Sequence, residues 1–439
     1  MNTILELQIK IRIALAAALL VAALAAPAAA QDIAIRGATI LTVTRGTIEN
    51  GTVVVRNGRI TAVGQNVAIP AGVRVIDGTG RYVMPGIVDA HSHMAMDRGV
   101  NEGTDAVTPE VVVQIRHDDP QLYRALAGGV TTINVLHGSA NVIGGQNATL
   151  KLRWGQPVED LYFQSAPRGI KFALGENVVR ANRPNVPGQQ PRFPTSRMGV
   201  EHTLRWWFTQ AQEYREEWDR YERESRRNRN LVPPRRDLRL EALADILRGR
   251  ILVHAHSYRA DEILMLLRVA EDFGFKIHSL QHVLEGYKVA DEIAAHGAGA
   301  STFADNWAYK VEAWDAIPHN PALMAERGVS VSINSDSGER VRRLYQEAAK
   351  AVKYGGASEE EALAMITINP ARHLGVQDRV GSIEVGKDAD LAIFNGHPFA
   401  PASRVEMTLV DGRVYFDRAQ AMTLEKLLGQ GTAAAEVQR

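Results

Sequence analysis

Two histidines stand two residues apart at the end of a short apolar segment. Residues 85–93 read PGIVDAHSH, and the two imidazoles are those of His91 and His93. In an extended chain, side chains at positions i and i+2 point the same way. Both imidazoles would therefore project from one strand end and could begin a divalent metal site. The pattern alone is weak, because two histidines near a turn look the same.

Further along the chain, other apolar segments also end in residues of the kinds that bind metals. These are His254 and His256 after residues 251–253, His282 after 275–281, and Asp336 after 329–335. Helical patterns separate the segments, and this alternation indicates parallel strands with crossover helices. Parallel barrels carry their chemistry at the C-terminal ends of the strands. The histidines and Asp336 are therefore predicted to converge on one rim.

With these motifs the chain resembles the amidohydrolase superfamily, whose members are metal-dependent hydrolases on a distorted (β/α)8 TIM barrel. The resemblance extends from about residue 33 to about residue 414. It is carried by PGIVDAHSH, by His254 and His282 at strand ends, by NSD at 334–336 and by GSIEVGKDADL at 381–391. Within the superfamily, the chain is most similar to secreted, imidazolonepropionase-like or dipeptidase-like members.

The resemblance implies a role for each strand-end residue. His91 and His93 would bind a deeply placed cation, and Asp336 would reach it from the last strand. His254 and His282 would hold a second cation or tune the first. Nitrogen and oxygen donors suit Zn²⁺ best and permit Mn²⁺, Fe²⁺ or Co²⁺. One or two divalent ions are therefore expected, most simply zinc, with Asp336 and His282 as the catalytic residues.

In this scheme the metal lowers the pKa of a bound water and polarises the scissile carbonyl. Asp336 would accept the water proton and pass it to the leaving nitrogen. His256 competes with His254 as a ligand because both face the same way. In the family pattern the first histidine of such a run ligates, which assigns His254 to the metal and His256 to a substrate contact.

Lys171 lies on a short apolar segment, where an ammonium group is costly to bury and readily loses its proton. The neutral amine could take up CO₂ and form a carbamate. Binuclear members of the resembled family use a lysine of the fourth strand in this way to bridge two metals. The alternative is a lysine that contacts substrate or pairs with Glu176, so a mononuclear and a binuclear site both stay open.

The loop at residues 136–141 follows the apolar segment 130–135 and should therefore lie at the rim. His137 and Asn141 are candidates for hydrogen bonds to substrate, and the alternative is that both are ordinary turn residues.

Hydrolysis of an amide-type C–N bond in a small molecule or dipeptide is the preferred activity. Deaminases that share this barrel carry a glutamate just after the strand-five histidine, where this chain has His256, so deamination is disfavoured. A non-catalytic scaffold on the same fold is the other alternative, but it has no need for five strand-end metal-type residues.

Composition limits the partners and the location. The 439 residues include 50 Lys plus Arg and 50 Asp plus Glu, so no net charge favours nucleic acid. The absence of cysteine excludes a thiolate site. Residues 1–30 combine Lys10 and Arg12, an apolar stretch and AAA at 28–30, which is typical of a secretory signal peptide. A secreted or periplasmic protein is expected, outside the membrane after cleavage, and both a monomer and a homo-oligomer stay open.

The predicted fold is α/β with two units. Residues 84–375 would form the barrel, with a helical insertion at 201–248 whose aromatic residues more simply pack on the barrel than form a lid. Residues 31–83 and 376–420 alternate apolar and polar residues, and by the resemblance they would form one β-sandwich from both ends of the chain.

Overall fold

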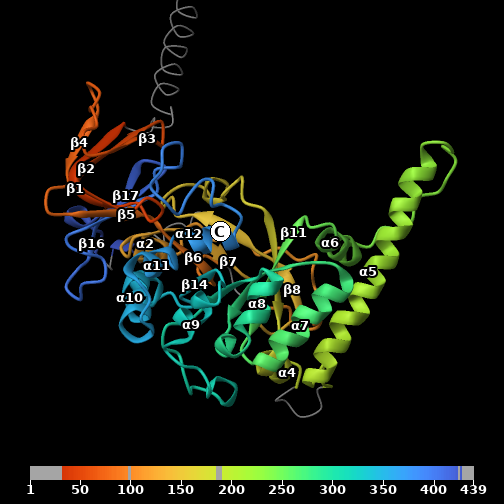
Figure 1. The fold of residues 1–439 in the computed structure, drawn as a ribbon. Helices are drawn as coiled ribbons and strands as arrows, with labels where there is room; N and C mark the ends of the chain where they lie inside the picture. The colour runs from red at the N-terminus through yellow and green to blue at the C-terminus, as the bar shows by residue number, and fades with distance from the viewer. Residues whose placement is uncertain (1–31, 97–99, 184–189, 424–425, 428–439) are drawn as a thin grey trace, which may run out of the picture.

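The computed structural model describes residues 32–96, 100–183, 190–423 and 426–427, and the segment predicted to be a signal peptide lies outside them. It is an α/β structure whose strands form three sheets (Figure 1). Its helices are α2 (Pro120–Leu126), α3 (Val158–Leu161), α4 (Gly175–Ala181), α5 (Arg197–Ser225), α6 (Leu238–Leu247), α7 (Ala260–Phe273), α8 (Ala290–His296), α9 (Asn320–Glu326), α10 (Leu344–Gly355), α11 (Glu359–Ala364) and α12 (Ile368–His373). Four 3₁₀ turns are η1 (Gly286–Lys288), η2 (Val311–Ala313), η3 (Val341–Arg343) and η4 (Arg418–Gln420).

The two ends of the described chain meet in one eight-stranded sheet. Its strands are β1 (Ile33–Leu41), β2 (Thr47–Arg56), β3 (Arg59–Gly64), β4 (Arg74–Asp77), β5 (Tyr82–Pro85), β15 (Leu391–Phe394), β16 (Val405–Val410) and β17 (Arg413–Asp417). The order is β17-β16-β15-β5-β1-β2-β3, with β4 paired to β1. The antiparallel pairing of β15 with β5 therefore joins the C-terminal strands to the N-terminal ones.

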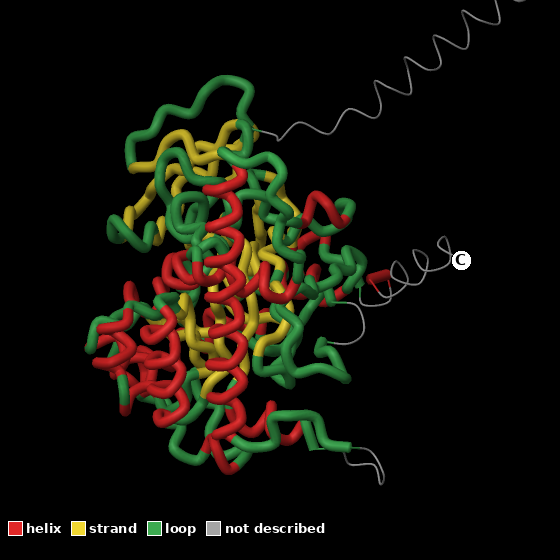
Figure 2. Tube along the Cα trace, turned by 90° about the vertical axis from the view of Figure 1, so that its right-hand side faces the viewer, coloured by secondary structure: helices red, strands yellow, loops and turns green. Residues whose placement is uncertain are grey.

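The strands between these ends form the other two sheets, which lie at the centre of the molecule (Figure 2). One has the order β6-β7-β9, with β6 (Ile87–Ser92), β7 (Val130–Val135) and β9 (Ala148–Lys151). The other has the order β14-β13-β12-β11-β10-β8, with β8 (Ile143–Gln146), β10 (Arg168–Ala173), β11 (Ile251–Ser257), β12 (Ile277–His282), β13 (Gly299–Thr302) and β14 (Val331–Ile333).

The strands β10 to β14 pair in parallel, and so do β6 and β7. Every residue of β6 and β7 is buried, as parallel strands covered on both faces require. The predicted strand-helix alternation with parallel strands is therefore confirmed. A closed (β/α)8 barrel and a two-layer sandwich stay predictions, since the strand pairings of the described residues form three separate sheets.

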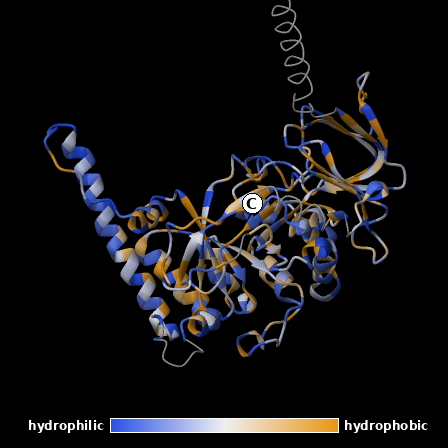
Figure 3. Cartoon of the chain, turned by 180° about the vertical axis from the view of Figure 1, so that it is seen from behind, coloured by the Kyte–Doolittle hydropathy of each residue, from blue (hydrophilic) through white to orange (hydrophobic). Residues whose placement is uncertain are grey.

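The predicted insertion at 201–248 consists of two helices, α5 and α6, joined by a non-helical segment. The long helix α5 begins earlier than expected because Ser196 caps it, with its Oγ accepting from the Gly199 amide at 3.1 Å. Phe208 on its buried face stacks on Phe275 with ring centroids 4.3 Å apart. The remainder of α5 extends away from the sheets and is mostly hydrophilic (Figures 1 and 3).

The length and hydrophobicity of the described helices bear on whether any of them could span a membrane. None of the helices in the described part of the chain is both long enough and apolar enough to cross a membrane.

A buried ionic cluster connects the terminal sheet to β9. The Lys151 side chain is fully buried, and its Nζ donates to Asp388 Oδ2 at 2.7 Å and to Asp390 Oδ1 at 3.2 Å. It also donates to Asp411 at the turn between β16 and β17. Because Asp388 and Asp390 belong to the GKDADL motif, that motif has a structural role in joining the sheets.

We predict that Lys151→Met lowers the free energy of unfolding by about 3–5 kcal/mol, because among the described residues Lys151 is the one cation that pairs with the buried Asp390 carboxylate. Asp388 and Asp411 keep Arg379 and Arg153 as partners. Denaturant unfolding followed by circular dichroism measures the change. Lys353→Met, at an exposed lysine of α10, is the control and should change stability by less than about 0.5 kcal/mol. Equal stability of the two variants would contradict a structural role for the cluster.

Candidate metal centre

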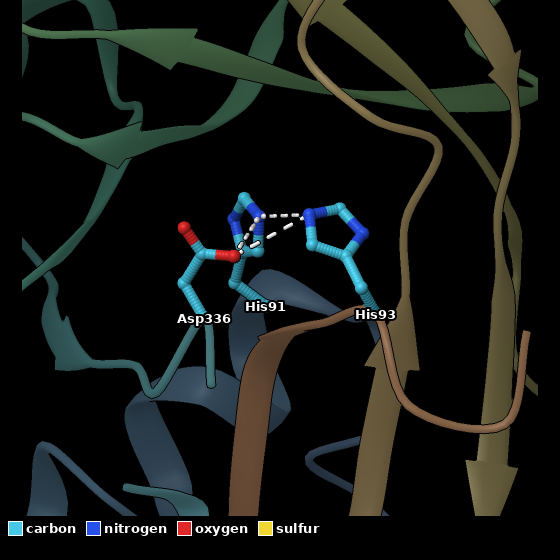
Figure 4. A group of neighbouring side chains, drawn as sticks. All are labelled: His91, His93 and Asp336. Atoms are coloured by element: carbon cyan, nitrogen blue, oxygen red, sulfur yellow. Dashed lines mark hydrogen bonds and ion pairs between the residues drawn. The ribbon is translucent and has the colours of Figure 1, made fainter. Parts of the chain in front are cut away.

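Three of the predicted ligands converge in the structure (Figure 4). His91 lies in β6, His93 follows it, and Asp336 follows β14. The two Nε2 atoms are 3.4 Å apart, and Asp336 Oδ1 lies 3.6 Å from His91 Nε2 and 3.4 Å from His93 Nε2. Donor atoms that lie about 2.0–2.1 Å from a tetrahedral zinc are about 3.3 Å from one another. The spacing of this triad therefore fits a small divalent cation.

Main-chain hydrogen bonds hold the segment after β14 against β6. The Asp336 amide donates to the His91 carbonyl at 3.2 Å. The Asp89 carboxylate accepts from the Ser335 amide at 3.1 Å, from Ser335 Oγ at 2.5 Å and from the His91 amide at 3.3 Å. Asp336 itself has a φ of 43°, a left-handed conformation that non-glycine residues rarely adopt. Such conformations persist where surrounding contacts enforce them, as the Asp89 contacts do here.

The imidazoles of His91 and His93 are oriented by their other ring nitrogens. His91 Nδ1 lies 3.0 Å from Gln281 Oε1, and His93 Nδ1 lies 2.9 Å from the Leu136 carbonyl oxygen. Because both partners are acceptors, each Nδ1 carries the proton and each Nε2 offers its lone pair to the centre. Burial lowers the pKa of His93 to about 4 and that of His91 well below its usual value. Both rings are therefore neutral, as metal ligands must be.

Lys171 lies beside this triad on β10. Its side chain is fully buried, and Nζ is 3.4 Å from His91 Nε2 and 3.4 Å from the His137 carbonyl oxygen. Burial lowers the pKa of Lys171 to about 7. Glu176, the alternative partner considered from sequence, pairs instead with Arg180 at 3.0 Å. The structure thus contains a readily deprotonated amine next to the candidate ligands.

His282 forms the opposite side of the centre, at the end of β12. Its Nε2 lies 4.0 Å from Asp336 Oδ2, and its ring centroid lies 4.6 Å from that of His91. Its φ of 72° is also left-handed. The Nδ1 atom is buried without a hydrogen-bond partner. An orphaned buried nitrogen at this position fits a second metal ligand, because buried polar atoms are nearly always paired.

The two histidines of β11 differ in their surroundings. His254 Nδ1 lies 2.8 Å from Ser279 Oγ. Neither ring nitrogen of His256 has a hydrogen-bond partner among the described residues, and its ring centroid lies 4.7 Å from that of His282. The family pattern favours His254 as the ligand of this strand, whereas the unpartnered nitrogens favour His256.

The two candidates from the loop after β7 also differ. Asn141 donates from Nδ2 to Thr108 Oγ1 at 3.2 Å and accepts at Oδ1 from Arg192 at 3.2 Å. Its side chain is therefore engaged on both ends within the fold. His137 is buried with an unpartnered Nδ1, and burial lowers its pKa to about 4. Of the two, His137 is the one with unused hydrogen-bonding capacity.

The candidate base, Asp336, is influenced by nearby charges. Burial raises the pKa of Asp336 to about 6, although Lys171, Arg340 and Lys310 act to lower it. A carboxylate with a pKa near neutrality can both take up and release a proton at physiological pH.

Sequence reasoning did not single out the groups that orient the ligands. Asp89, Gln281 and Ser335 all lie within the motifs or strand ends that were recognised, but nothing in their spacing identifies their partners. The one available signal was the position of Asp89, which precedes His91 by two residues and so faces the same side of β6.

Comparison with known proteins agrees with this geometry. The model of the Amidohydrolase family matches residues 82–415. A solved amidohydrolase structure from Thermotoga maritima MSB8 is 34% identical, covers 88% of this chain and 100% of that chain, and superposes with a TM-score of 0.79.

Two curated relatives are also similar over most of this chain. The amidohydrolase tasK of Hapsidospora irregularis is 29% identical over 84% of this chain, and the match spans 40% of tasK. A 5-methylthioadenosine/S-adenosylhomocysteine deaminase of Symbiobacterium thermophilum is 24% identical, over 88% of this chain and 94% of the relative.

The chain belongs to the Amidohydrolase family, and the resemblance inferred from its motifs is confirmed. Homologues in this family, including imidazolonepropionases and deaminases, are hydrolytic enzymes that act on C–N bonds. The prediction of an enzyme of this hydrolytic class is thereby confirmed at the level of the family.

We predict that the purified protein carries about one to two equivalents of a divalent transition metal and that His91→Ala loses most of it. The variant removes the His91 Nε2 atom, which lies close to the donor atoms of His93 and Asp336. Elemental analysis after equilibration with zinc measures the content. His254→Ala and His256→Ala, analysed in parallel, identify which β11 histidine ligates, because only that variant should lose metal.

The control is His373→Ala, since His373 Nε2 bonds to the Ser330 carbonyl at 2.9 Å, away from the triad. Wild-type protein that stays metal-free after supplementation would contradict the assignment of a metal centre.

Proposed function

We propose that this protein hydrolyses an amide-type C–N bond in a small molecule or dipeptide with the help of one or two bound divalent cations, most simply zinc. The observation that carries the proposal is the convergence of two neutral Nε2 atoms and one carboxylate oxygen at spacings that fit a cation. His91, His93 and Asp336 would hold the first ion. His282, a β11 histidine and Lys171 would hold a second.

The metal, when bound, supplies Lewis acidity that makes water nucleophilic at neutral pH and polarises a carbonyl. The chain itself supplies the proton transfers. Asp336 Oδ1 faces both imidazoles, and as a carboxylate it accepts the proton of the attacking water. After the tetrahedral intermediate forms, the protonated Asp336 donates that proton to the leaving nitrogen, so the amine departs neutral.

His282 is the second residue proposed to act in catalysis. Its ring lies between the rings of His256 and His91, within 4.7 Å of each centroid. His137 and His256 are proposed to contact substrate if they do not bind metal, because both carry unpartnered buried nitrogens. Asn141 keeps this role only if substrate displaces its present partners.

Deamination is the second candidate, because a deaminase is among the relatives. It is less well supported here, since the position after the β11 histidine that carries a glutamate in such enzymes is occupied by His256. A scaffold without activity has no use for buried, unpaired histidine nitrogens, which are costly unless a ligand satisfies them. The location outside the cytoplasm and a homo-oligomeric state belong to this proposal and rest on the sequence alone.

We predict that Asp336→Asn lowers turnover by about 100-fold or more while most of the metal is retained, because the amide keeps an oxygen donor but cannot accept the proton. Steady-state kinetics on a substrate found among N-acyl amino acids, dipeptides and cyclic amides, together with metal analysis, measure both effects. Asp315→Asn, at an exposed rim carboxylate, is the control. Near-normal turnover of Asp336→Asn would assign the proton transfer to another group.

We predict that Lys171 reacts with CO₂ to form a carbamate that bridges two cations. Its buried amine, with a pKa near 7, provides the unprotonated nucleophile. Reloading metal-free protein in bicarbonate should then raise the metal content toward two equivalents, and Lys171→Ala should retain only one. Lys276→Ala is the control, because Lys276 Nζ donates to the His296 carbonyl at 3.0 Å and not to the centre.

A bicarbonate-independent metal content, unchanged by Lys171→Ala, would refute the bridge. The protein would then be a mononuclear hydrolase.

A further inference from the structure

Two contacts place the half-buried Arg340 beside the candidate centre, at a position called its mouth below. Its Nη1 donates to the carbonyl oxygen of Ser335, the residue before Asp336, at 3.2 Å. Its Cζ lies 5.3 Å from the ring centroid of Phe303. Phe303 in turn stacks on His282, with centroids 4.7 Å apart and ring planes 20° apart. The Phe303 ring therefore lies next to both the Arg340 guanidinium group and the His282 ring. The carbonyl group that Arg340 contacts belongs to the residue before Asp336.

The charge of Arg340 is not balanced by an ion pair. Within the described part of the chain, no carboxylate oxygen lies within 4.0 Å of its guanidinium nitrogens. The nearest residues of its own segment pair elsewhere, since Arg342 and Arg343 both contact Glu339. Arg340 is half-buried, so this unbalanced charge lies in partly desolvated surroundings.

The other cation at the mouth is in a different situation. Lys310 Nζ forms an ion pair with Glu312 at 2.9 Å and donates to Asn177 Oδ1 at 2.8 Å. It also lies 4.3 Å from the ring centroid of Tyr258. Lys310 is therefore already engaged within the fold, and Arg340 is the cation with free donors. One guanidinium group presents five N–H donors in a plane, and among the residues that the structure describes only its Nη1 has a hydrogen-bond partner.

We propose that Arg340 binds a carboxylate group of the substrate and so selects amides that carry a free carboxylate near the scissile bond, such as N-acyl amino acids or dipeptides with a free C-terminus. This inference rests on the proposed hydrolytic function. A planar guanidinium matches a carboxylate in a bidentate arrangement, which gives orientation as well as affinity. A single unpaired cation balances the one negative charge of a carboxylate, whereas a phosphate dianion would need a second.

The position of Arg340 also sets which end of the substrate enters. With the carboxylate held against Arg340, the remainder of the substrate extends toward the face of Asp336 that meets His91 and His93. The bond that reaches this face lies a short distance from the carboxylate, as the amide of an N-acyl amino acid does. Binding at Arg340 would thereby bring the carbonyl carbon to the water that Asp336 deprotonates.

The experiment compares matched substrates that differ only in charge. N-acetyl-L-amino acids and L-alanyl dipeptides are assayed with zinc-loaded protein beside the same compounds with a C-terminal carboxamide. Wild-type protein should prefer each acid to its amide by at least about 10-fold in kcat/KM. Arg340→Met should lower kcat/KM for the acids by about 10- to 100-fold, mainly through KM, because a charge-assisted hydrogen bond is lost. The amides should change by less than about threefold.

Two variants separate charge from geometry and from fold. Arg340→Lys keeps the charge without the planar donors and should fall between wild type and Arg340→Met. Arg343→Met, at an exposed neighbour that pairs with Glu339, should leave both substrate series unchanged. Dissociation constants of the amino acid products and of their amides, measured by isothermal titration calorimetry, supply a binding measurement that does not depend on turnover. Metal content and thermal unfolding of each variant confirm that the fold and the centre are intact.

The outcomes distinguish the two proposals. Turnover without a preference for acids, or an equal loss for acids and amides in Arg340→Met, overturns the role of Arg340 and leaves the hydrolase in place. A metal-loaded wild-type protein that hydrolyses none of these compounds and binds none of their products overturns the assignment of both the substrate class and Arg340. Loss of the acid preference in Arg340→Met alone supports the inference.

Discussion

The candidate centre depends on one buried carboxylate that no substrate or metal would touch. Asp89 accepts hydrogen bonds from the amides of His91 and Ser335 and from the Ser335 hydroxyl, and so joins β6 to the segment after β14. Burial raises the pKa of Asp89 to about 7, so these donors stabilise a charge that desolvation disfavours. Together with the hydrogen bond that the Asp336 amide donates to the His91 carbonyl, these contacts hold Asp336 opposite the two imidazoles. Strand geometry makes the two imidazoles project together, and the hydrogen bonds of Asp89 help to place Asp336 near them.

Desolvation acts on every group of the centre in the same direction, toward the uncharged form. It lowers the pKa values of His91, His93 and Lys171 and raises that of Asp336. For imidazoles and an amine this is the form that has a free lone pair, and for the acid it is the form that can donate a proton. One physical cause, burial at strand ends, thus prepares ligands, a nucleophilic amine and a proton carrier together. In the proposed mechanism, burial of these groups would thereby let a largely hydrophobic set of strands support an ionic reaction.

The sequence was informative wherever function depends on local periodicity. The i, i+2 spacing predicted that His91 and His93 project together, and the ends of apolar segments predicted that Asp336 joins them. The sequence did not predict interactions between segments that are far apart along the chain. Gln281 orients His91 across 190 positions, and Asp89 meets Ser335 across 246. Such partners depend on strand order and register, which a single sequence does not contain.

The same limit applies to the insertion and to the mouth of the site. The aromatic spacing of residues 201–248 predicted a packed helix face, and Phe208 packs against Phe275 as a member of such a face would. The cap at Ser196 and the break after Ser225 moved the boundaries by a few residues, since helix ends depend on local capping rather than on periodicity. Arg340 belongs to no recognised motif. It became a candidate because, among the described residues, no carboxylate forms an ion pair with it.

The charge on Lys171 in the centre and the charge on Arg340 at its mouth would act on the same bound substrate. A carbamate would add a negative charge to the Lys171 Nζ, which lies 3.4 Å from His91 Nε2 and whose positive charge burial disfavours, and this would strengthen the binding of divalent cations. Arg340, one aromatic ring away from His282, would be the cation that orients an anionic substrate under the proposal made above. In this arrangement Lys171 determines how many metals are bound, and Arg340 determines which end of the substrate stays at the mouth.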